Sequence, residues 1–304
     1  MTDGALVFDR AARRLRRDRL ARLSDGDRAD AGFLFAEVGE RLADRLDDVT
    51  RRFPLALDLG ARDGLMGRLL NGRGGIETLI QADPSPALAA LAPGMALAMD
   101  EETLALADAS LDLVVSNLAL HWVNDLPGCL IQARRALKPD GLFLAAMLGG
   151  ETLRELRWAL TEAEQRVSGG VSPRVSPFAD VRDAGALLQR AGFALPVVDL
   201  DEITVSYGDP LRLMADLRAM GESNAVLARR RQPAPRRLLA EAAGLYRERF
   251  GDADGRVPAT FQVLFLTAWS PHETQQRPAA RGSGQVSLTD ALNAPPSPPS
   301  PSDE

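Results

Sequence analysis

The sequence predicts an α/β fold built on a parallel sheet, and three observations support this prediction. Short apolar runs are separated by segments long enough for a crossover helix, and two later runs are rich in Val, Ile, Thr and aromatic residues. The 304 residues are 45% apolar and 26% charged, which is enough to bury one large core. The expected parallel strands are Leu55–Leu59, Thr78–Ala82, Met95–Met99, Leu113–Ser116 and Leu142–Met147, and the terminal pair is Val197–Tyr207 and Thr260–Trp269.

The remaining segments predict how the chain is organised around this sheet. We expect residues 1–50 to be helical and residues 51–207 to form the α/β domain. Helix-period patterns predict an inserted helical cap over residues 208–255, before a final strand and C-terminal motif over residues 256–290. Residues 291–304 are rich in Pro and Ser and contain too few apolar groups to offset the entropy cost of ordering, so we expect them to be disordered.

The arginine-rich stretch Phe8 to Arg22 needs separate interpretation, because it has some features of a targeting peptide. It lacks an apolar core and contains Asp9 and Asp18, so we expect a solvated amphipathic helix of the mature protein. The sequence has no run of eighteen or more apolar residues, so we expect no integral membrane segment. We therefore expect a cytoplasmic protein that reaches the inner face of the membrane only through a partner.

Composition excludes several classes of function. The net charge of −6 and the 5% aromatic content argue against a nucleic-acid partner, because phosphate binding needs clustered excess Lys and Arg. The single cysteine, Cys129, excludes an internal disulfide framework. With only His121 and His272 as histidines, we expect no metal site.

The most informative local segment is a glycine turn after the first strand. Asp58 lies within the buried run Leu55–Leu59, and Gly60 and Gly64 allow the backbone to turn close to a ligand. Asp83 follows about twenty residues later at the end of the second strand, where a carboxylate accepts hydrogen bonds from a ribose diol. An ordinary strand-to-helix corner with a surface aspartate is the alternative interpretation.

The spacing of this turn is not the dinucleotide pattern G-x-G-x-x-G. It resembles D-x-G-x-x-x-G, motif I of class I methyltransferases, except that Arg62 stands where those enzymes usually have glycine. The resemblance implies a Rossmann-like class I methyltransferase sheet that binds S-adenosyl-L-methionine. It implies that Asp100, after the third strand, meets the adenine and that Glu101 and Asn117 are also cofactor-binding residues. A solvated acidic turn is the alternative for Asp100.

Two further segments supply candidate residues for the substrate side. His121 and Trp122 follow the fourth strand, where ligands of open α/β sheets bind. The segment does not read Asn-Pro-Pro-Tyr, so it does not resemble the amide or exocyclic-amine methyltransferases that use that loop. His121 is a candidate general base, although packing of both rings against the pocket is equally consistent. Glu222 lies in the expected cap and suits a cationic substrate, whereas Ser223 and Asn224 are equally suited to capping a helix.

Longer motifs give a broader resemblance, from about Phe8 to Ser287. The motifs are HWVNDLP at His121 to Pro127, LKPDG at Leu137 to Gly141, GGETLRELR at Gly149 to Arg157, SPF at Ser176 to Phe178, MGESN at Met220 to Asn224, DGRVPATFQV at Asp254 to Val263, and His272-Glu273 with Arg277-Pro278 and Arg281 to Ser283. They resemble the family of the mitochondrial complex I assembly factor 5, and more distantly the malonyl-carrier-protein methyltransferases of biotin synthesis.

The resemblance implies an enzyme of the S-adenosylmethionine-dependent methyltransferase type that modifies a protein partner, a complex I iron–sulfur subunit. The mitochondrial family member is described as hydroxylating an arginine of such a subunit, so arginine hydroxylation is one alternative. A non-catalytic assembly chaperone is another. Oxygen insertion at a protein metal site would need both histidines together with an acid such as Glu273.

Overall fold

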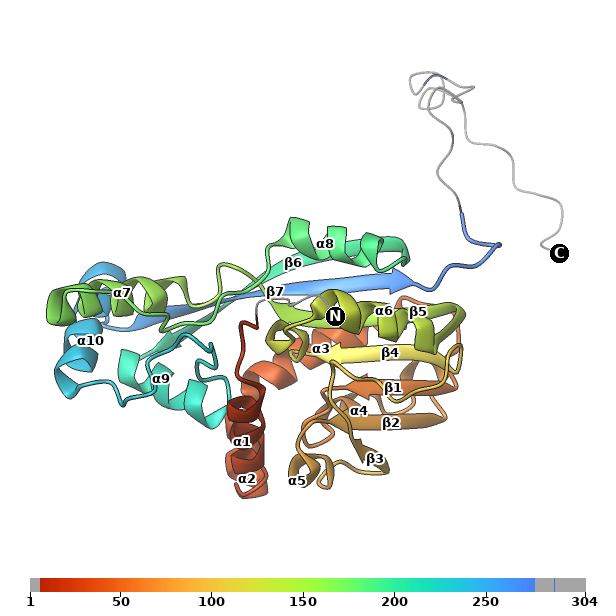
Figure 1. The fold of residues 1–304 in the computed structure, drawn as a ribbon, viewed down its shortest axis with the longest axis horizontal. Coiled ribbons are helices and arrows are strands. Elements are labelled where there is room, and N and C mark those ends of the chain that lie inside the picture. Colours follow the sequence, from red (N-terminus) through yellow and green to blue (C-terminus); the bar gives the residue numbers. More distant parts are fainter. Residues whose placement is uncertain (1–5, 277–286, 288–304) are drawn as a thin grey trace. The chain divides into compact units, whose positions relative to one another are not determined.

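Residues 6–276 and 287 are described by the computed structural model, and they form one seven-stranded sheet (Figure 1). The strand order is β3-β2-β1-β4-β5-β7-β6. The first five strands are parallel, and β7 runs antiparallel to both β5 and β6. The strands are β1 Leu55–Leu59, β2 Thr78–Asp83, β3 Met95–Ala98, β4 Leu111–Asn117, β5 Leu137–Leu148, β6 Ala194–Tyr207 and β7 Val257–Trp269.

Helices precede the sheet, connect its strands and fill the segment between the last two strands. Three of them, α1 to α3, come before β1, and α9 and α10 lie between β6 and β7, where helices of a cap were expected. The helices are α1 Arg10–Leu20, α2 Asp25–Ala31, α3 Phe33–Asp47, α4 Leu65–Leu70, α5 Pro86–Ala89, α6 Leu126–Ala136, α7 Arg154–Ser168, α8 Val181–Arg190, α9 Pro210–Ala219 and α10 Arg236–Phe250, with the short 3-10 turns η1 Arg73–Gly75 and η2 Leu120–Trp122.

All seven expected strands form, and the differences lie at their ends. β5 begins at Leu137 rather than at Leu142, because Leu137 pairs with Leu111 of β4 across an irregularity in the register. Apolar runs mark only the buried part of a strand, so polar residues that continue a ladder were left out of the prediction.

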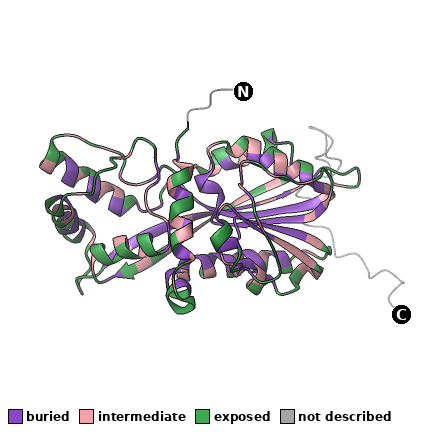
Figure 2. Cartoon of the chain, turned by 60° about the horizontal axis from the view of Figure 1, so that its bottom comes forward, coloured by how far each residue is buried: buried purple, intermediate pink, exposed green. Residues whose placement is uncertain are grey.

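Apolar side chains cover both faces of the sheet. Along β5, Leu142 and Leu144 belong to one buried cluster, whereas Phe143 and Ala145 belong to the other. This alternation follows from the two-residue repeat of a strand. The first cluster includes residues of α3, α7 and α10, and the second includes residues of α6 and α8. Figure 2 shows the resulting pattern, with buried strands between helices whose outer faces are exposed.

The long strands β6 and β7 extend beyond the parallel strands toward α7, α9 and α10 (Figure 1). Helices α7 and α10 pack against each other, and the hydroxyl of Tyr246 on α10 donates a hydrogen bond to the Pro258 carbonyl of β7 at 2.7 Å. The chain therefore has a helical layer next to the carboxyl ends of the parallel strands. Those ends form the edge at which ligands of open α/β sheets bind.

The chain divides into two compact units, residues 1–271 and 272–304. In the second unit only residues 272–276 and 287 are described, and the backbone N–H of His272 donates to the Gln275 side chain at 3.2 Å. Arg277-Pro278, Arg281 to Ser283 and the tail expected over residues 291–304 lie outside the described residues. Among the described helices, none has both the length and the apolar character needed to cross a bilayer.

We predict that Leu42→Ala lowers the free energy of unfolding by roughly 2–5 kcal/mol, the usual cost of a cavity in a packed core. Leu42 of α3 is fully buried in the first cluster. Leu15→Ala is the matched control, because Leu15 is 58% exposed on α1. Urea unfolding of both variants measures the difference, and equal effects would show that α3 does not pack as described.

Candidate functional site

Four carboxylates gather where β1, β2 and β3 end. Asp58 lies within β1, Asp83 is the last residue of β2, and Asp100 and Glu101 follow β3. The first two and Glu101 are fully buried. Parallel register places them at one edge, because Asp58 pairs with Gln81 and Asp83 with Ala98. The sheet therefore brings four carboxyl groups together in the region expected for the cofactor.

The glycine turn after β1 approaches its neighbours closely. Gly60 has φ 82°, and a Cβ built there would lie 2.3 Å from the Cβ of Ala119, in the loop after β4. Gly64 has φ 80° and precedes α4, and a Cβ there would lie 2.6 Å from the Gln81 side chain and from Pro93. Both positions combine left-handed backbone with lack of space, so both require glycine.

Arg62, at the third position of this turn, also has a positive φ, 56°. Its backbone N–H donates to Asp83 at 2.9 Å. Its guanidinium lies over the ring of Phe35 on α3, 3.7 Å from the ring centroid, and donates to the Met220 carbonyl at 3.2 Å. Burial, and then the charge of Arg17, lower the pKa of Arg62 to about 10. Arg62 therefore connects the glycine turn to the segment after α9.

Helix α1 contradicts the expectation of a solvated helix. Asp9 caps its N-terminus by accepting from the Ala12 N–H, and the helix presents arginines at three-, four- and seven-residue spacing on one face. Arg10 pairs with Asp100 at 2.6 Å and with Glu101, and Arg17 pairs with Asp83 at 3.2 Å. The expectation failed because arginine is normally exposed, and nothing local reveals carboxylates that lie far along the chain.

Several buried polar atoms around these pairs have no hydrogen-bond partner. They include Nε of Arg13 and of Arg17 as donors, and both oxygens of Asp58 and Oε1 of Glu101 as acceptors. Buried polar groups in proteins are nearly always satisfied, so these donors and acceptors are groups with which a bound polar ligand could form hydrogen bonds. A ligand with a carboxylate, an ammonium group and hydroxyls would satisfy both sets, and S-adenosylmethionine carries all three.

A cavity of about 490 Å³ lies next to this region. It is lined by Pro84 and Pro86 after β2, by Met99 and Asp100 after β3, and by α1. The carboxylates beside it differ in their charge. Burial, and then the charge of Asp83, raise the pKa of Asp58 to about 8. Burial also raises the pKa of Glu101, but the charges of Arg10, Arg17 and Arg13 together outweigh it, so the pKa of Glu101 is lowered.

The three residues expected on the substrate side lie together in a second cluster. Glu222 accepts hydrogen bonds from the Trp122 indole N–H at 2.8 Å and from His121 at 3.1 Å. His121 and Trp122 belong to η2, the short turn after β4. Gly221, with φ 80°, ends α9, and the Glu222 N–H bonds back to the Leu217 carbonyl at 2.8 Å. This C-terminal cap aims Glu222 at the two rings.

The hydrogen-bond partners assign the protonation states of this cluster. The backbone N–H of Leu148 donates to Nδ1 of His121 at 3.4 Å, so the ring proton lies on Nε2 and is donated to Glu222. Burial lowers the pKa of His121 more than Glu222 raises it. Burial raises the pKa of Glu222, but the bond from His121 and the charge of Arg13 lower it to about 2. A neutral His121 thus donates to an ionised Glu222 and orients that carboxylate, and the role of His121 as a general base stays a prediction.

Arg13 joins the two clusters. Its guanidinium lies 4.7 Å from the ring centroid of Trp122 and 3.6 Å from Glu222. Burial, and then the charge of Arg17, lower the pKa of Arg13 to about 9. The Trp122 face and the Glu222 carboxylate therefore already accommodate a guanidinium group, in a place where the side chain is 3% exposed.

The remaining candidate residues make contacts of other kinds. The Asn117 amide donates to the Phe35 carbonyl at 2.8 Å, which ties β4 to α3. Ser223 and Asn224 do not cap a helix, since α10 begins after Pro235. Asn224 instead donates to the Pro173 carbonyl at 2.7 Å. Among the described residues, no group of three His, Cys, Asp or Glu side chains is arranged to hold a metal ion.

Comparisons with known proteins agree with this fold. A family model for a methyltransferase domain matches residues 57–145. "Arginine-hydroxylase NDUFAF5, mitochondrial" of Danio rerio is 44% identical over 292 residues, which cover 94% of this chain and 90% of that protein. A malonyl-[acyl-carrier protein] O-methyltransferase of Halorhodospira halophila is 37% identical over 267 residues, 85% of this chain and 88% of that one.

One solved structure is similar to this chain in fold alone. Phosphoethanolamine N-methyltransferase 2 of Haemonchus contortus, in complex with S-adenosylhomocysteine, superposes with a TM-score of 0.51 at 17% identity. The match covers 84% of this chain and 60% of that one. Together with the family model, it confirms the predicted Rossmann-like class I methyltransferase fold.

Asp58 generates a prediction about pH. Because its pKa is raised from 3.8 to about 8, the folded chain retains a proton that the unfolded chain releases in this interval. The free energy of unfolding should therefore fall as pH rises through that window, and Asp58→Asn should reduce the fall. Urea unfolding at several pH values measures it, with Asp108→Asn, an exposed residue paired with Arg135, as the control. Identical slopes in wild type and Asp58→Asn would refute the assignment.

Proposed function

Since the chain belongs to the family of the arginine-hydroxylase NDUFAF5, we propose that it binds S-adenosylmethionine and modifies an arginine side chain of a protein partner. The observation that carries the proposal is the second cluster. An ionised, buried Glu222 lies beside the face of Trp122, and a guanidinium group already lies against both. A planar cation recognised by a carboxylate and an aromatic face is the chemistry of arginine binding. We place this action in the assembly of respiratory complex I, on one of its iron–sulfur subunits.

The first cluster would hold the cofactor. Asp83 and Glu101 would accept hydrogen bonds from its hydroxyl and amino groups, and Arg17 of α1 would face its carboxylate. The Gly60 turn allows close approach of backbone, and the orphaned oxygens of Asp58 suit an ammonium group. When bound, S-adenosylmethionine supplies a methyl group activated by the sulfonium centre.

The second cluster would hold and orient the acceptor arginine. Glu222 would pair with its guanidinium, Trp122 would fix the plane of that group, and His121 would keep Glu222 ionised and in place. Burial excludes water from this point, which strengthens each of these interactions. The helical segment 208–255 would act as a cap, since it carries Glu222.

Two reactions are compatible with this arrangement. Hydroxylation is the first candidate, because relatives that cover nearly the whole chain carry that activity in their names. It needs molecular oxygen and an external electron donor. Methyl transfer is the second candidate, because the family model that matches residues 57–145 is a methyltransferase domain. A non-catalytic assembly chaperone is the third candidate function. Arg62 favours it, because this position is usually glycine in methyltransferases and the change is consistent with a loss of catalysis.

The test is peptide mass spectrometry of the complex I iron–sulfur subunits from cells that lack the gene and are complemented with variants. We predict that wild type either adds one oxygen atom to an arginine or replaces one of its hydrogens by a methyl group, which raises the peptide mass by one CH2. Glu222→Gln should reduce this modification by about tenfold or more, because a neutral amide cannot pair with a guanidinium. Glu241→Gln is the control, because Glu241 is a partly exposed residue of α10.

The outcomes separate the three functions. A mass increase of one oxygen atom establishes hydroxylation, and a mass increase of one CH2 establishes methyl transfer. Association with the subunit without a change in its mass establishes the chaperone. If the Glu222→Gln variant modifies the subunit as fully as wild type, Glu222 does not bind the acceptor arginine, whichever reaction occurs.

A further inference from the structure

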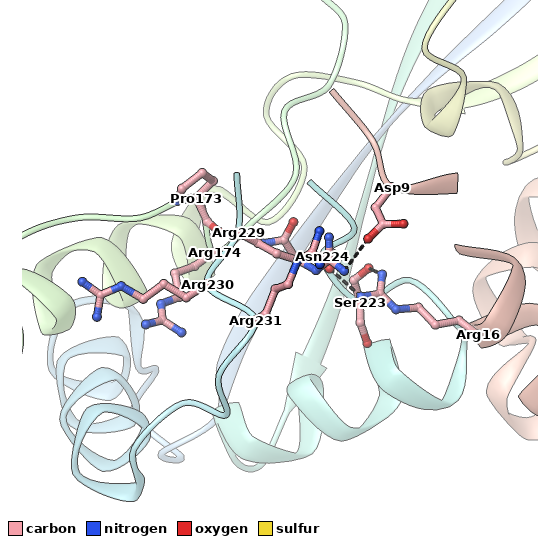
Figure 3. A pocket seen from close by; sticks show the side chains of 9 residues that line it. All are labelled: Asp9, Arg16, Pro173, Arg174, Ser223, Asn224, Arg229, Arg230 and Arg231. Carbon is pink, nitrogen blue, oxygen red and sulfur yellow. Dashed lines mark hydrogen bonds and ion pairs between the residues drawn. The ribbon is translucent and has the colours of Figure 1, made fainter. Parts of the chain in front are cut away.

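A strongly basic pocket of about 460 Å³ lies outside the two clusters (Figure 3). Three segments far apart in the sequence line it: α1, the loop after α7, and the segment after α9. The chain as a whole has a net charge of −6, so a local excess of arginine is not a consequence of composition. The five arginines of the pocket are Arg16, Arg174, Arg229, Arg230 and Arg231.

Among the described residues, two carboxylates form ion pairs with three of these five arginines. Arg229 pairs with Asp9 at 2.9 Å, and Glu164 pairs with both Arg174, at 2.6 Å, and Arg230, at 3.4 Å. The two remaining arginines have no carboxylate of their own among the described residues. Arg16 donates to the backbone carbonyls of Ser223 and Asn224, and Arg231 is exposed.

The positive charges are close enough to repel each other. Burial, and next the charge of Arg229, lower the pKa of Arg16. A like charge disfavours the charged form of a group, and an anion between the two guanidinium groups would remove that cost. The pocket therefore has an unsatisfied preference for negative charge in addition to its excess of donors.

A smaller cavity of about 140 Å³ has lining residues in common with the arginine pocket and with the second cluster. It shares Arg174, Ser223 and Asn224 with the arginine pocket, and Glu222 also lines it. Leu156, Leu160, Phe178 and Met214 are among its lining residues. A cavity lined by apolar side chains and by a buried carboxylate suits an aliphatic stem with a cationic end.

We propose that the arginine pocket binds acidic side chains of the protein partner. These side chains would lie next to the partner's arginine, which would enter the smaller cavity that Glu222 lines. The inference rests on the proposed function for the identity of the partner as a protein. Carboxylates are the expected ligands because the pocket's arginines already hold two of them, Asp9 and Glu164, in hydrogen-bonded ion pairs. Three segments line the mouth, so it recognises several side chains of a peptide rather than one compact anion.

The experiment measures binding of two labelled peptides to the full chain by fluorescence anisotropy. One peptide has a central arginine flanked by glutamates, and the other has the same arginine flanked by glutamines. The variant is Arg230→Ala/Arg231→Ala, whose side chains line the mouth and are half-exposed or exposed. The matched control is Arg236→Ala/Arg237→Ala, which removes the same charge from exposed positions at the start of α10.

We expect wild type to bind the glutamate peptide more tightly than the glutamine peptide, with an affinity that falls as salt is added. The pocket variant should bind the glutamate peptide roughly tenfold more weakly, and the control should match wild type. Equal affinities of all three proteins for the glutamate peptide would overturn the proposal. So would displacement of this peptide by inorganic phosphate at low millimolar concentration, because the pocket would then be a site for a compact anion.

Failure of this inference is distinguishable from failure of the proposed function. Binding of the glutamate peptide requires no chemical change, and modification of the partner arginine is read separately by mass. If the pocket variant binds the peptide normally while wild type modifies its partner, only the docking proposal fails. If docking depends on the pocket but no mass change occurs, docking stands and the proposed reaction falls.

Discussion

The ion pairs between α1 and the carboxyl edge of the sheet are the interaction on which the rest of the site depends. Buried carboxylates at the ends of β2 and β3 repel each other and lose their hydration, and opposite charge in contact with them lowers the free-energy cost of their burial. Arg10 and Arg17 supply that charge to Glu101 and Asp83. The same helix carries Arg13 to Glu222 and Arg16 to the basic pocket. One helix face thus organises both clusters.

A second connection runs through Arg62. Its backbone N–H holds Asp83, whereas its guanidinium donates to the carbonyl of Met220, two residues before Glu222. The residue that departs from the glycine of motif I therefore links the region expected for the cofactor to the region expected for the acceptor. The left-handed backbone of a non-glycine residue costs free energy, and the buried stacking on Phe35 offsets part of that cost.

The strands were predictable because buried parallel strands are short apolar runs, and Asp83 was predictable because strand two ends at it. Family motifs, rather than periodicity, brought His121 and Trp122 together with Glu222, about a hundred residues away. The role of α1 was not predictable by composition, since a helix of arginines normally faces water. A stripe of Arg10, Arg13 and Arg17 on one face was the available signal. That this stripe is buried could not be inferred from the helix alone, because the carboxylates that pair with it lie far along the chain and come near only in the folded protein.

The central claim is that α1 contributes Arg17 to the cofactor site. Calorimetric titration of S-adenosylmethionine into wild type, Arg17→Ala and Arg19→Ala tests this most directly, because Arg19 is an exposed arginine of the same helix that does not line the cavity beside the carboxylates. The account predicts affinity weakened by about tenfold or more in Arg17→Ala, the effect of losing a charged hydrogen bond, and no change in Arg19→Ala. Equal or tighter binding by Arg17→Ala would contradict it, because α1 would then obstruct the site that it is said to complete.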